Sequence, residues 1–283
     1  MKNPHEVNLR DYKLIVFDID GTLIGRNHAL PKFTKETLLR LRGLGWNFTL
    51  ATGKTLPATK DLADELEIDL PLILCNGGLI QKRSGEIMDR ISMPMEVTRE
   101  IARICDERGQ DLVLYIEEGL FVRKLTDNMM PIYGIVQEGL HEIGNWGALG
   151  ERLAFTNKCV AVDTRPENGL DALEEIFRGA LNGRADMMRT SPELLDVVPR
   201  GVNKAVGLKK LTKKLGIKMG EVVAFGDYDN DAPMLAAAGL GVAVDGATQA
   251  ALESADIQVG SCEQEGPARF LAGLLKKRER LPK

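Results

Sequence analysis

The chain has 283 residues, 44% hydrophobic and 28% charged, which is typical of a globular protein with one large or two medium domains. Its net charge of -4 disfavours a nucleic-acid partner, and no stretch approaches the roughly 20 apolar residues that a membrane-spanning helix needs. Four widely spaced cysteines and an N-terminus without an apolar signal region predict free thiols and a cytoplasmic location.

The first 80 or so residues alternate between short apolar runs and helical patterns. Strands are predicted to end at Asp18, near Thr52 and at Cys75, and helices are predicted over about 34–43 and 57–66. Near-continuous apolar strands separated by helices are typical of a parallel sheet covered on both faces.

The pattern changes in the middle of the chain. Hairpins with alternating polar and apolar residues are predicted over 79–90 and 111–124, the second turning near Glu118, and helices over about 96–108 and 167–181. The strand–helix rhythm returns from residue 203. We therefore expect an α/β protein with a doubly wound, Rossmann-like parallel-sheet core formed by 1–82 and 197–283, and an inserted α+β domain over 83–196.

Two carboxylates follow the first strand. Asp18 and Asp20 come directly after LIVF with one residue between them, and strand alternation would send both side chains to the same side. A buried carboxylate is costly unless it is paired or bound to a metal. The pattern therefore indicates a site in which one carboxylate attacks or binds metal and the other moves a proton. A strand followed by an Asx-turn is the alternative for this pattern taken alone.

Two other segments have features of an anion site. Thr52 and Gly53 follow the second strand near a helix start, where a hydroxyl and a backbone amide can bind an anion. A P-loop is excluded, because Phe48 stands where its first glycine is required. Lys204 opens the helix after the insert, where the helix dipole disfavours a cation unless an anion lies nearby; an ordinary surface lysine is the alternative.

The strand EVVAFGD ends in a dense acidic segment that includes Asp227, Asp229, Asn230 and Asp231. Acids gathered at a buried strand end repel one another unless a cation neutralises them, and ligands that are all oxygen favour a hard ion such as Mg²⁺. Asp231 has two open roles, one linked to the metal and one as the cap of the following helix.

Taken together, FDIDGTL, ATGK, the lone Lys204 and GDYDND, in that order, resemble the motifs of the haloacid dehalogenase superfamily of phosphohydrolases. The position of the insert, between Thr52 and Lys204, is similar to that in the Cof-type branch (subclass IIB). Members of this branch carry an α/β cap and are mostly small-molecule phosphatases. The sequence CNGG at 75–78 also resembles the C/T-N-G-A loop of that branch.

The resemblance implies a role for each candidate residue. Asp18 would be the nucleophile that forms an aspartyl-phosphate, and Asp20 would be the general acid and then the general base, a role for which we expect a buried side chain. The Mg²⁺ site would comprise Asp18, Asp20 (through its main-chain carbonyl), Asp227 and, in support, Asp231. The phosphate would be held by Thr52, Gly53, Lys204 and Asn230.

The expected function is Mg²⁺-dependent hydrolysis of a small phosphomonoester, such as a sugar phosphate. A phosphomutase of the phosphomannomutase kind is the alternative, since it shares the nucleophile and a similar cap. A catalytically silent ligand-binding protein is disfavoured by the intact acidic residues and Lys204. Lys54 departs from the family pattern, which often has arginine there; lysine keeps the charge but loses the planar fork. The sequence does not define the oligomeric state.

Overall fold

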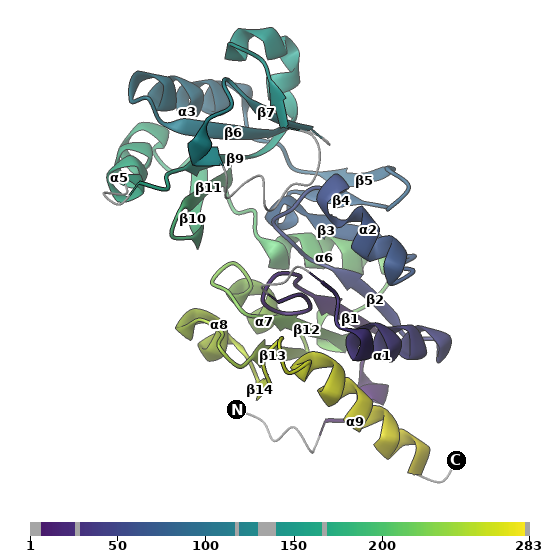
Figure 1. Ribbon diagram of the computed structural model, residues 1–283. Helices are drawn as coiled ribbons and strands as arrows, with labels where there is room; N and C mark the ends of the chain where they lie inside the picture. Colours follow the sequence, from purple (N-terminus) through teal and green to yellow (C-terminus); the bar gives the residue numbers. More distant parts are fainter. Residues whose placement is uncertain (1–6, 26–28, 117–118, 130–139, 166–168, 281–283) are drawn as a thin grey trace.

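A computed structural model describes residues 7–25, 29–116, 119–129, 140–165 and 169–280. The chain forms a parallel α/β core and an inserted part built on a mostly antiparallel sheet, which lies above the core in Figure 1. The predicted fold class is therefore confirmed. No helix in the described ranges is both long and apolar enough to cross a membrane.

The core is a five-stranded sheet in the order β14-β13-β12-β1-β2, and each neighbouring pair is parallel. All five strands are short and largely apolar, as a sheet covered on both faces requires. Their bounds are β1 Leu14–Phe17, β2 Asn47–Leu50, β12 Val222–Gly226, β13 Leu240–Val244 and β14 Ile257–Val259.

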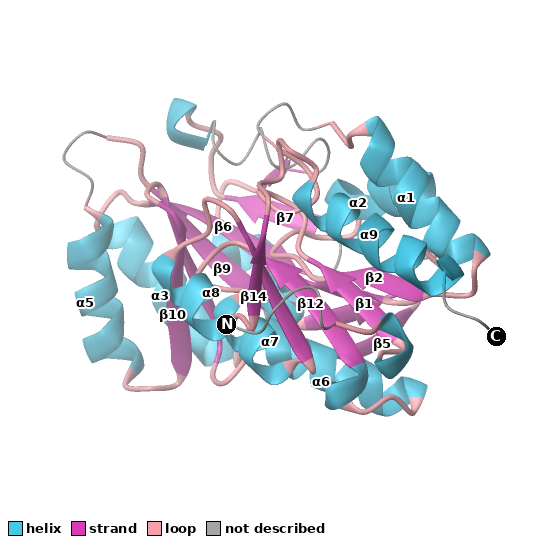
Figure 2. Cartoon of the chain, turned by 90° about the horizontal axis from the view of Figure 1, so that it is seen from below, coloured by secondary structure: helices cyan, strands magenta, loops and turns pink. Residues whose placement is uncertain are grey.

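Helices cover both faces of this sheet (Figure 2). One layer consists of α1 (Lys32–Gly43), α2 (Pro57–Glu65) and α9 (Gly266–Arg280), and the other of α6 (Lys204–Leu215), α7 (Ala232–Ala237) and α8 (Gln249–Ser254).

Successive residues of β1 face alternate layers. Ile15 and Phe17 belong to the apolar cluster that includes α1 and α9, whereas Leu14 and Val16 belong to the cluster that includes α6 and α7. This alternation, which follows from the period of two along a strand, determines the layer toward which Asp18, the residue directly after β1, points.

The third predicted strand differs from the expectation. Strand β3 (Leu72–Leu74) runs parallel to β2 through a single bridge between Ala51 and Ile73, but its ladder is with β4 (Leu79–Gln81), which pairs in turn with β5 (Ile87–Arg90). The cause is the tight turn at Cys75–Gly77, where three consecutive residues have positive φ and reverse the chain onto β3.

The inserted part contains a six-stranded sheet in the order β10-β11-β9-β6-β7-β8, antiparallel except for β7 and β8. Helices α3 (Met95–Glu107) and α5 (Leu170–Leu181) pack on one face of it. The strand bounds are β6 Asp111–Ile116, β7 Gly119–Val122, β8 Leu140–Glu142, β9 Thr156–Val162, β10 Ala185–Ser191 and β11 Leu194–Pro199.

The division of the chain into 1–82 with 197–283 and 83–196 stays a prediction. Strands β4 and β5, which it separates at residue 82, pair with each other, and β11 spans its second boundary. The hairpin of β6 and β7 forms where the alternation predicted it, but Glu118 of its turn lies outside the described residues.

Candidate active site

Asp18 and Lys204 meet at the carboxyl end of the core sheet. Asp18 follows β1 and is 6% exposed, and its backbone N–H donates to the Phe225 carbonyl of β12 at 3.0 Å. The Lys204 Nζ donates to Asp18 Oδ1 at 2.5 Å and to Asp231 Oδ1 at 2.6 Å. Lys204 is 1% exposed, so it is a buried cation between two carboxylates and not a surface lysine.

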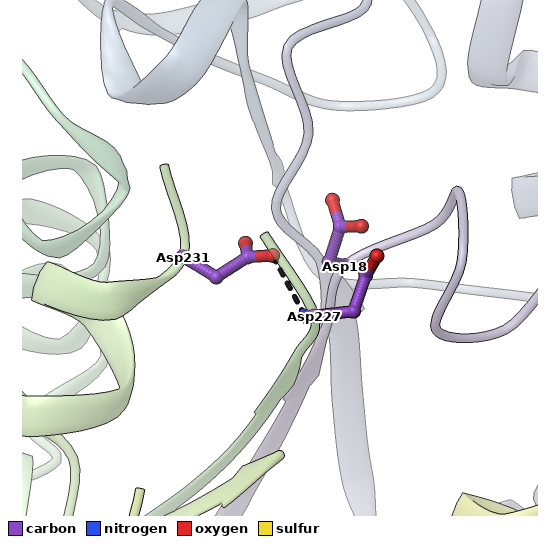
Figure 3. A group of neighbouring side chains, drawn as sticks. All are labelled: Asp18, Asp227 and Asp231. Atoms are coloured by element: carbon purple, nitrogen blue, oxygen red, sulfur yellow. Dashed lines mark hydrogen bonds between the residues drawn. The ribbon is translucent and has the colours of Figure 1, made fainter. Parts of the chain in front are cut away.

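The side chain of Asp231 orients the acidic loop. Its Oδ2 accepts hydrogen bonds from the backbone N–H groups of Asp227 at 3.0 Å and Tyr228 at 3.1 Å, the first of which is drawn in Figure 3. Asp231 stands at the N-cap of α7, but its side chain makes no capping hydrogen bond to that helix. Of the two roles left open by the sequence, the capping role is therefore not the one its carboxylate plays.

Asp227 lies beside Asp18 at the end of β12 (Figure 3). The Thr22 hydroxyl donates to Asp227 Oδ1 at 2.8 Å, and Gly21, with φ +82°, packs against the same carboxylate. A Cβ at Gly21 would lie 2.2 Å from Asp227 Oδ2, so the loop after β1 needs a glycine for both its backbone conformation and its close approach.

Three carboxylates therefore share a small volume. One oxygen from each of Asp18, Asp227 and Asp231 lies within 4.8 Å of the others. Burial, and next the charge of Asp231, raise the pKa of Asp18 well above its usual range, while Lys204 opposes the shift. The same two causes raise the pKa of Asp227 to about 6. The single ammonium of Lys204 does not balance this cluster, and a bound divalent cation would relieve it.

The predicted phosphate-binding residues gather beside this cluster. Thr52 is 2% exposed, and its Oγ1 accepts from the Lys54 backbone N–H at 3.2 Å. A Cβ at Gly53 would lie 3.2 Å from Asn76 Oδ1, the same oxygen that accepts from Asn230 Nδ2 at 3.0 Å. Asn76, fully buried and with φ +55°, thus contacts both the Gly53 turn and Asn230.

Asp20 does not have the buried environment that we expected. Strand β1 ends at Phe17, so the strand alternation does not extend to Asp20, whose side chain is 49% exposed and lies outside the carboxylate cluster formed by the described residues. The Lys54 Nζ donates to Asp20 Oδ1 at 2.8 Å. The lysine that departs from the family pattern therefore holds the proposed general acid by one hydrogen bond.

A cavity of about 300 Å³ opens above these residues and is lined from both parts of the chain. The core contributes the predicted residues other than Lys204 and Asp231, which are buried beneath it. The inserted part contributes residues that the sequence reasoning missed, among them Tyr115, Lys158 and Asp196. The available signal for Lys158 and Asp196 was a charged residue next to a run of apolar strand residues, in TNKCVAV and LLDVVP.

This fold and acidic site define a class of protein. Residues 15–271 match the family of haloacid dehalogenase-like hydrolases, and the chain belongs to that family, as its motifs predicted. It is therefore an enzyme of the hydrolase class.

Particular relatives cover almost the whole chain. The HMP-PP phosphatase of Yersinia pseudotuberculosis is 28% identical over 263 residues, which are 92% of this chain and 94% of the relative. A haloacid dehalogenase-like hydrolase from Bacteroides thetaiotaomicron has 27% identity and a TM-score of 0.84, over 93% of this chain and 99% of that one. A subclass IIB sugar phosphatase with 23% identity and a TM-score of 0.77 shares the fold, over 93% of this chain and 99% of that one.

Proposed function

We propose that the protein is a Mg²⁺-dependent phosphatase that hydrolyses a small phosphomonoester, such as a sugar phosphate or a similar metabolite, through an aspartyl-phosphate on Asp18. The observation that supports this most directly is the buried Asp18 carboxylate, held by Lys204 beside Asp227 and Asp231, at the base of a cavity of about 300 Å³. Family membership and the phosphatase name of the Yersinia relative support the same reaction class.

The carboxylate cluster has the chemistry of a magnesium site. Its donors are all oxygen, which Mg²⁺ prefers. Burial, and next the charge of Asp231, raise the pKa values of Asp18 and Asp227, and a bound cation would favour the ionised form of both carboxylates. Asp18 and Asp227 would hold the ion, with the main-chain carbonyl of Asp20. Asp231 would support the site, because its carboxylate binds Lys204 and the backbone N–H groups of Asp227 and Tyr228. When bound, Mg²⁺ would neutralise the carboxylates and the phosphate and thereby allow their close approach.

The first chemical step follows from the position of Asp18. An Asp18 carboxylate oxygen forms a bond to phosphorus while the bond from phosphorus to the ester oxygen breaks, and Asp20 gives its proton to the departing alkoxide. Lys204 stabilises the negative charge around Asp18, and the phosphoryl oxygens lie against Thr52, the backbone at Gly53 and Asn230.

The second step releases the enzyme. Asp20, now ionised, takes a proton from water as the water oxygen bonds to phosphorus. The bond between phosphorus and Asp18 breaks, and inorganic phosphate leaves. Lys54 holds the Asp20 carboxylate at the wall of the cavity for both proton transfers.

We also propose a cytoplasmic location. All four cysteines are free and buried, and a reducing compartment is where thiols remain unpaired.

The test is turnover of p-nitrophenyl phosphate with Mg²⁺ or with EDTA, in the wild type and in Asp18→Asn. We expect turnover to require both Mg²⁺ and Asp18, because the variant removes the attacking carboxylate. Asp229→Asn is the matched control, since Asp229 lies in the same acidic segment but is exposed and outside the cluster. Turnover by Asp18→Asn at the wild-type rate, or turnover in EDTA, would refute the mechanism. A phosphoenzyme that resists water and passes its phosphate to a sugar phosphate would identify a phosphomutase.

A further inference from the structure

An ion pair stands on the wall of the cavity that faces the catalytic residues. Lys158 on β9 and Asp196 on β11 are 4% and 1% exposed, and the Lys158 Nζ donates to Asp196 Oδ2 at 2.6 Å. Both side chains line the cavity. A buried ion pair contributes little to stability compared with apolar residues of the same size, so its presence in two fully buried strands indicates another use.

Neighbouring groups hold this ion pair in place. Asp196 Oδ2 also accepts from Asn76 Nδ2 at 2.9 Å, and the Lys158 Nζ lies 4.4 Å from the centroid of the Tyr115 ring. Through Asn76, the pair is linked to Asn230 at the proposed phosphate site. The two charged side chains are therefore fixed relative to the reacting phosphate, as a recognition site for the rest of the substrate must be.

The charges around the cavity restrict the chemistry of that remaining part. Among the described lining residues the cations are Lys54 and Lys158, and each is paired with a carboxylate, that of Asp20 or of Asp196. Lys204, below the cavity, is shared by Asp18 and Asp231. A second anionic group on the substrate would find no surplus positive charge, so the leaving group that fits is uncharged.

The hydrogen-bonding capacity of Lys158 and Asp196 indicates which chemical group of the substrate they can bind. An ammonium has three N–H donors, and Lys158 gives one of them to Asp196. Asp196 Oδ1 accepts a long hydrogen bond from the Thr190 hydroxyl, at 3.4 Å, and has capacity for another donor. A hydroxyl group both accepts and donates, so it can bond to Lys158 and Asp196 together.

We propose that Lys158 and Asp196 form the leaving-group subsite of this enzyme, and that they bind a hydroxyl of an uncharged leaving group. This inference rests on the proposed phosphatase function. Tyr115, Val160 and Leu194 supply the apolar wall around the pair, against which the carbon skeleton of the leaving group packs.

The first test compares two esters on the wild-type enzyme. Sorbitol 6-phosphate and 6-phosphogluconate have open chains of equal length and differ at the far end, where a CH₂OH group is replaced by a carboxylate. We expect kcat/KM to be higher for sorbitol 6-phosphate by about tenfold or more, because the carboxylate meets the paired charge of Asp196. A preference for 6-phosphogluconate would overturn the proposal.

The second test changes the charge of the subsite. Asp196→Asn keeps an oxygen acceptor for Lys158 but leaves the ammonium unneutralised, so the preference should shift toward 6-phosphogluconate by about tenfold. Lys158→Met should lose about tenfold more kcat/KM with sorbitol 6-phosphate than with p-nitrophenyl phosphate, mainly through KM. Lys124→Met, an exposed lysine of the same inserted part, is the matched control. Equal losses on all substrates in both subsite variants would show that the pair is only structural.

Failure of the proposed phosphatase function can be distinguished from failure of the proposed subsite. If the wild type turns over none of these esters, p-nitrophenyl phosphate included, the phosphatase assignment fails. Binding of the two six-carbon esters, measured by isothermal titration calorimetry, then decides the subsite: tighter binding of sorbitol 6-phosphate supports it, and tighter binding of 6-phosphogluconate overturns it.

Discussion

Replacement of Lys204 by methionine would remove the one cation buried between Asp18 and Asp231 while nearly preserving the side-chain volume. Lys204 donates to both carboxylates, at 2.5 and 2.6 Å, and all three residues are at most 6% exposed. Removal of one partner from a buried ion pair typically costs about 3–5 kcal/mol, because the remaining charge stays unpaired in the interior. We expect that loss in the free energy of unfolding at about pH 8 in EDTA.

The loss of unfolding free energy in Lys204→Met should be smaller at acidic pH, and the direction of this pH dependence follows from the pKa values of the neighbouring acids. Burial raises the pKa of Asp18, and that of Asp227 to about 6, and loss of the cation raises them further. An acid with a higher pKa in the folded chain binds more protons when folded, so stability falls as the pH rises from the unfolded value, about 4, through the folded one. At about pH 5 the acids of the variant bind protons and lose most of their negative charge, so the free energy of unfolding differs less between the variant and the wild type.

Urea unfolding followed by circular dichroism at the two pH values measures this effect. The control is Lys209→Met, on the same helix but exposed, which should change stability by no more than about 0.5 kcal/mol. Turnover with Mg²⁺ should fall about 100-fold or more in Lys204→Met, since the charge next to Asp18 is lost in the transition state. Wild-type stability at about pH 8, or a loss independent of pH, would refute the electrostatic account of the cluster.

Two other expectations concern the same acids. Saturating Mg²⁺ should raise the thermal unfolding temperature more at about pH 8 than at about pH 5, because protons compete with Mg²⁺ for Asp227, whose pKa is about 6. Equal increases in unfolding temperature at the two pH values, or a wild-type increase in Asp227→Asn, would contradict Mg²⁺ binding at Asp227. Gly21→Ala and Gly45→Ala both force a Cβ into positive φ, at about 1–2 kcal/mol, but only the first meets a carboxylate. Gly21→Ala alone should weaken Mg²⁺ binding and lower kcat/KM about tenfold or more; similar kinetics in the two variants would contradict a close fit at Asp227.

Much of the core was predictable, because its information is local. The apolar runs before Asp18 and Asp227 identify β1 and β12, and parallel strands bring their carboxyl ends to one edge. The exposure of Asp20 was not predictable, because the alternation rule holds only while the chain remains a strand, and β1 ends at Phe17.

The contacts that cross the cavity depend on long-range register, which one sequence does not reveal. Lys158 and Asp196 are 38 residues apart and meet across β9 and β11. Asn76 contacts Asp196 and Asn230, which lie 120 and 154 residues further along the chain. A buried charge in an apolar strand predicts that a partner exists, but only the pairing of the strands identifies it.

The alternation along β1 has a consequence for insertions and deletions. Leu14 and Val16 face the layer of α6 and α7. Asp18 follows β1 directly, and its N–H still bonds to the Phe225 carbonyl of β12, so its side chain points to the same layer and meets Lys204 at the start of α6. Gain or loss of one residue within β1 would turn Asp18 toward the opposite layer, although every motif would still be present in the sequence. Length changes during evolution are therefore expected in the loops and in the inserted part, while the number of residues from the start of β1 to Asp18 should stay constant.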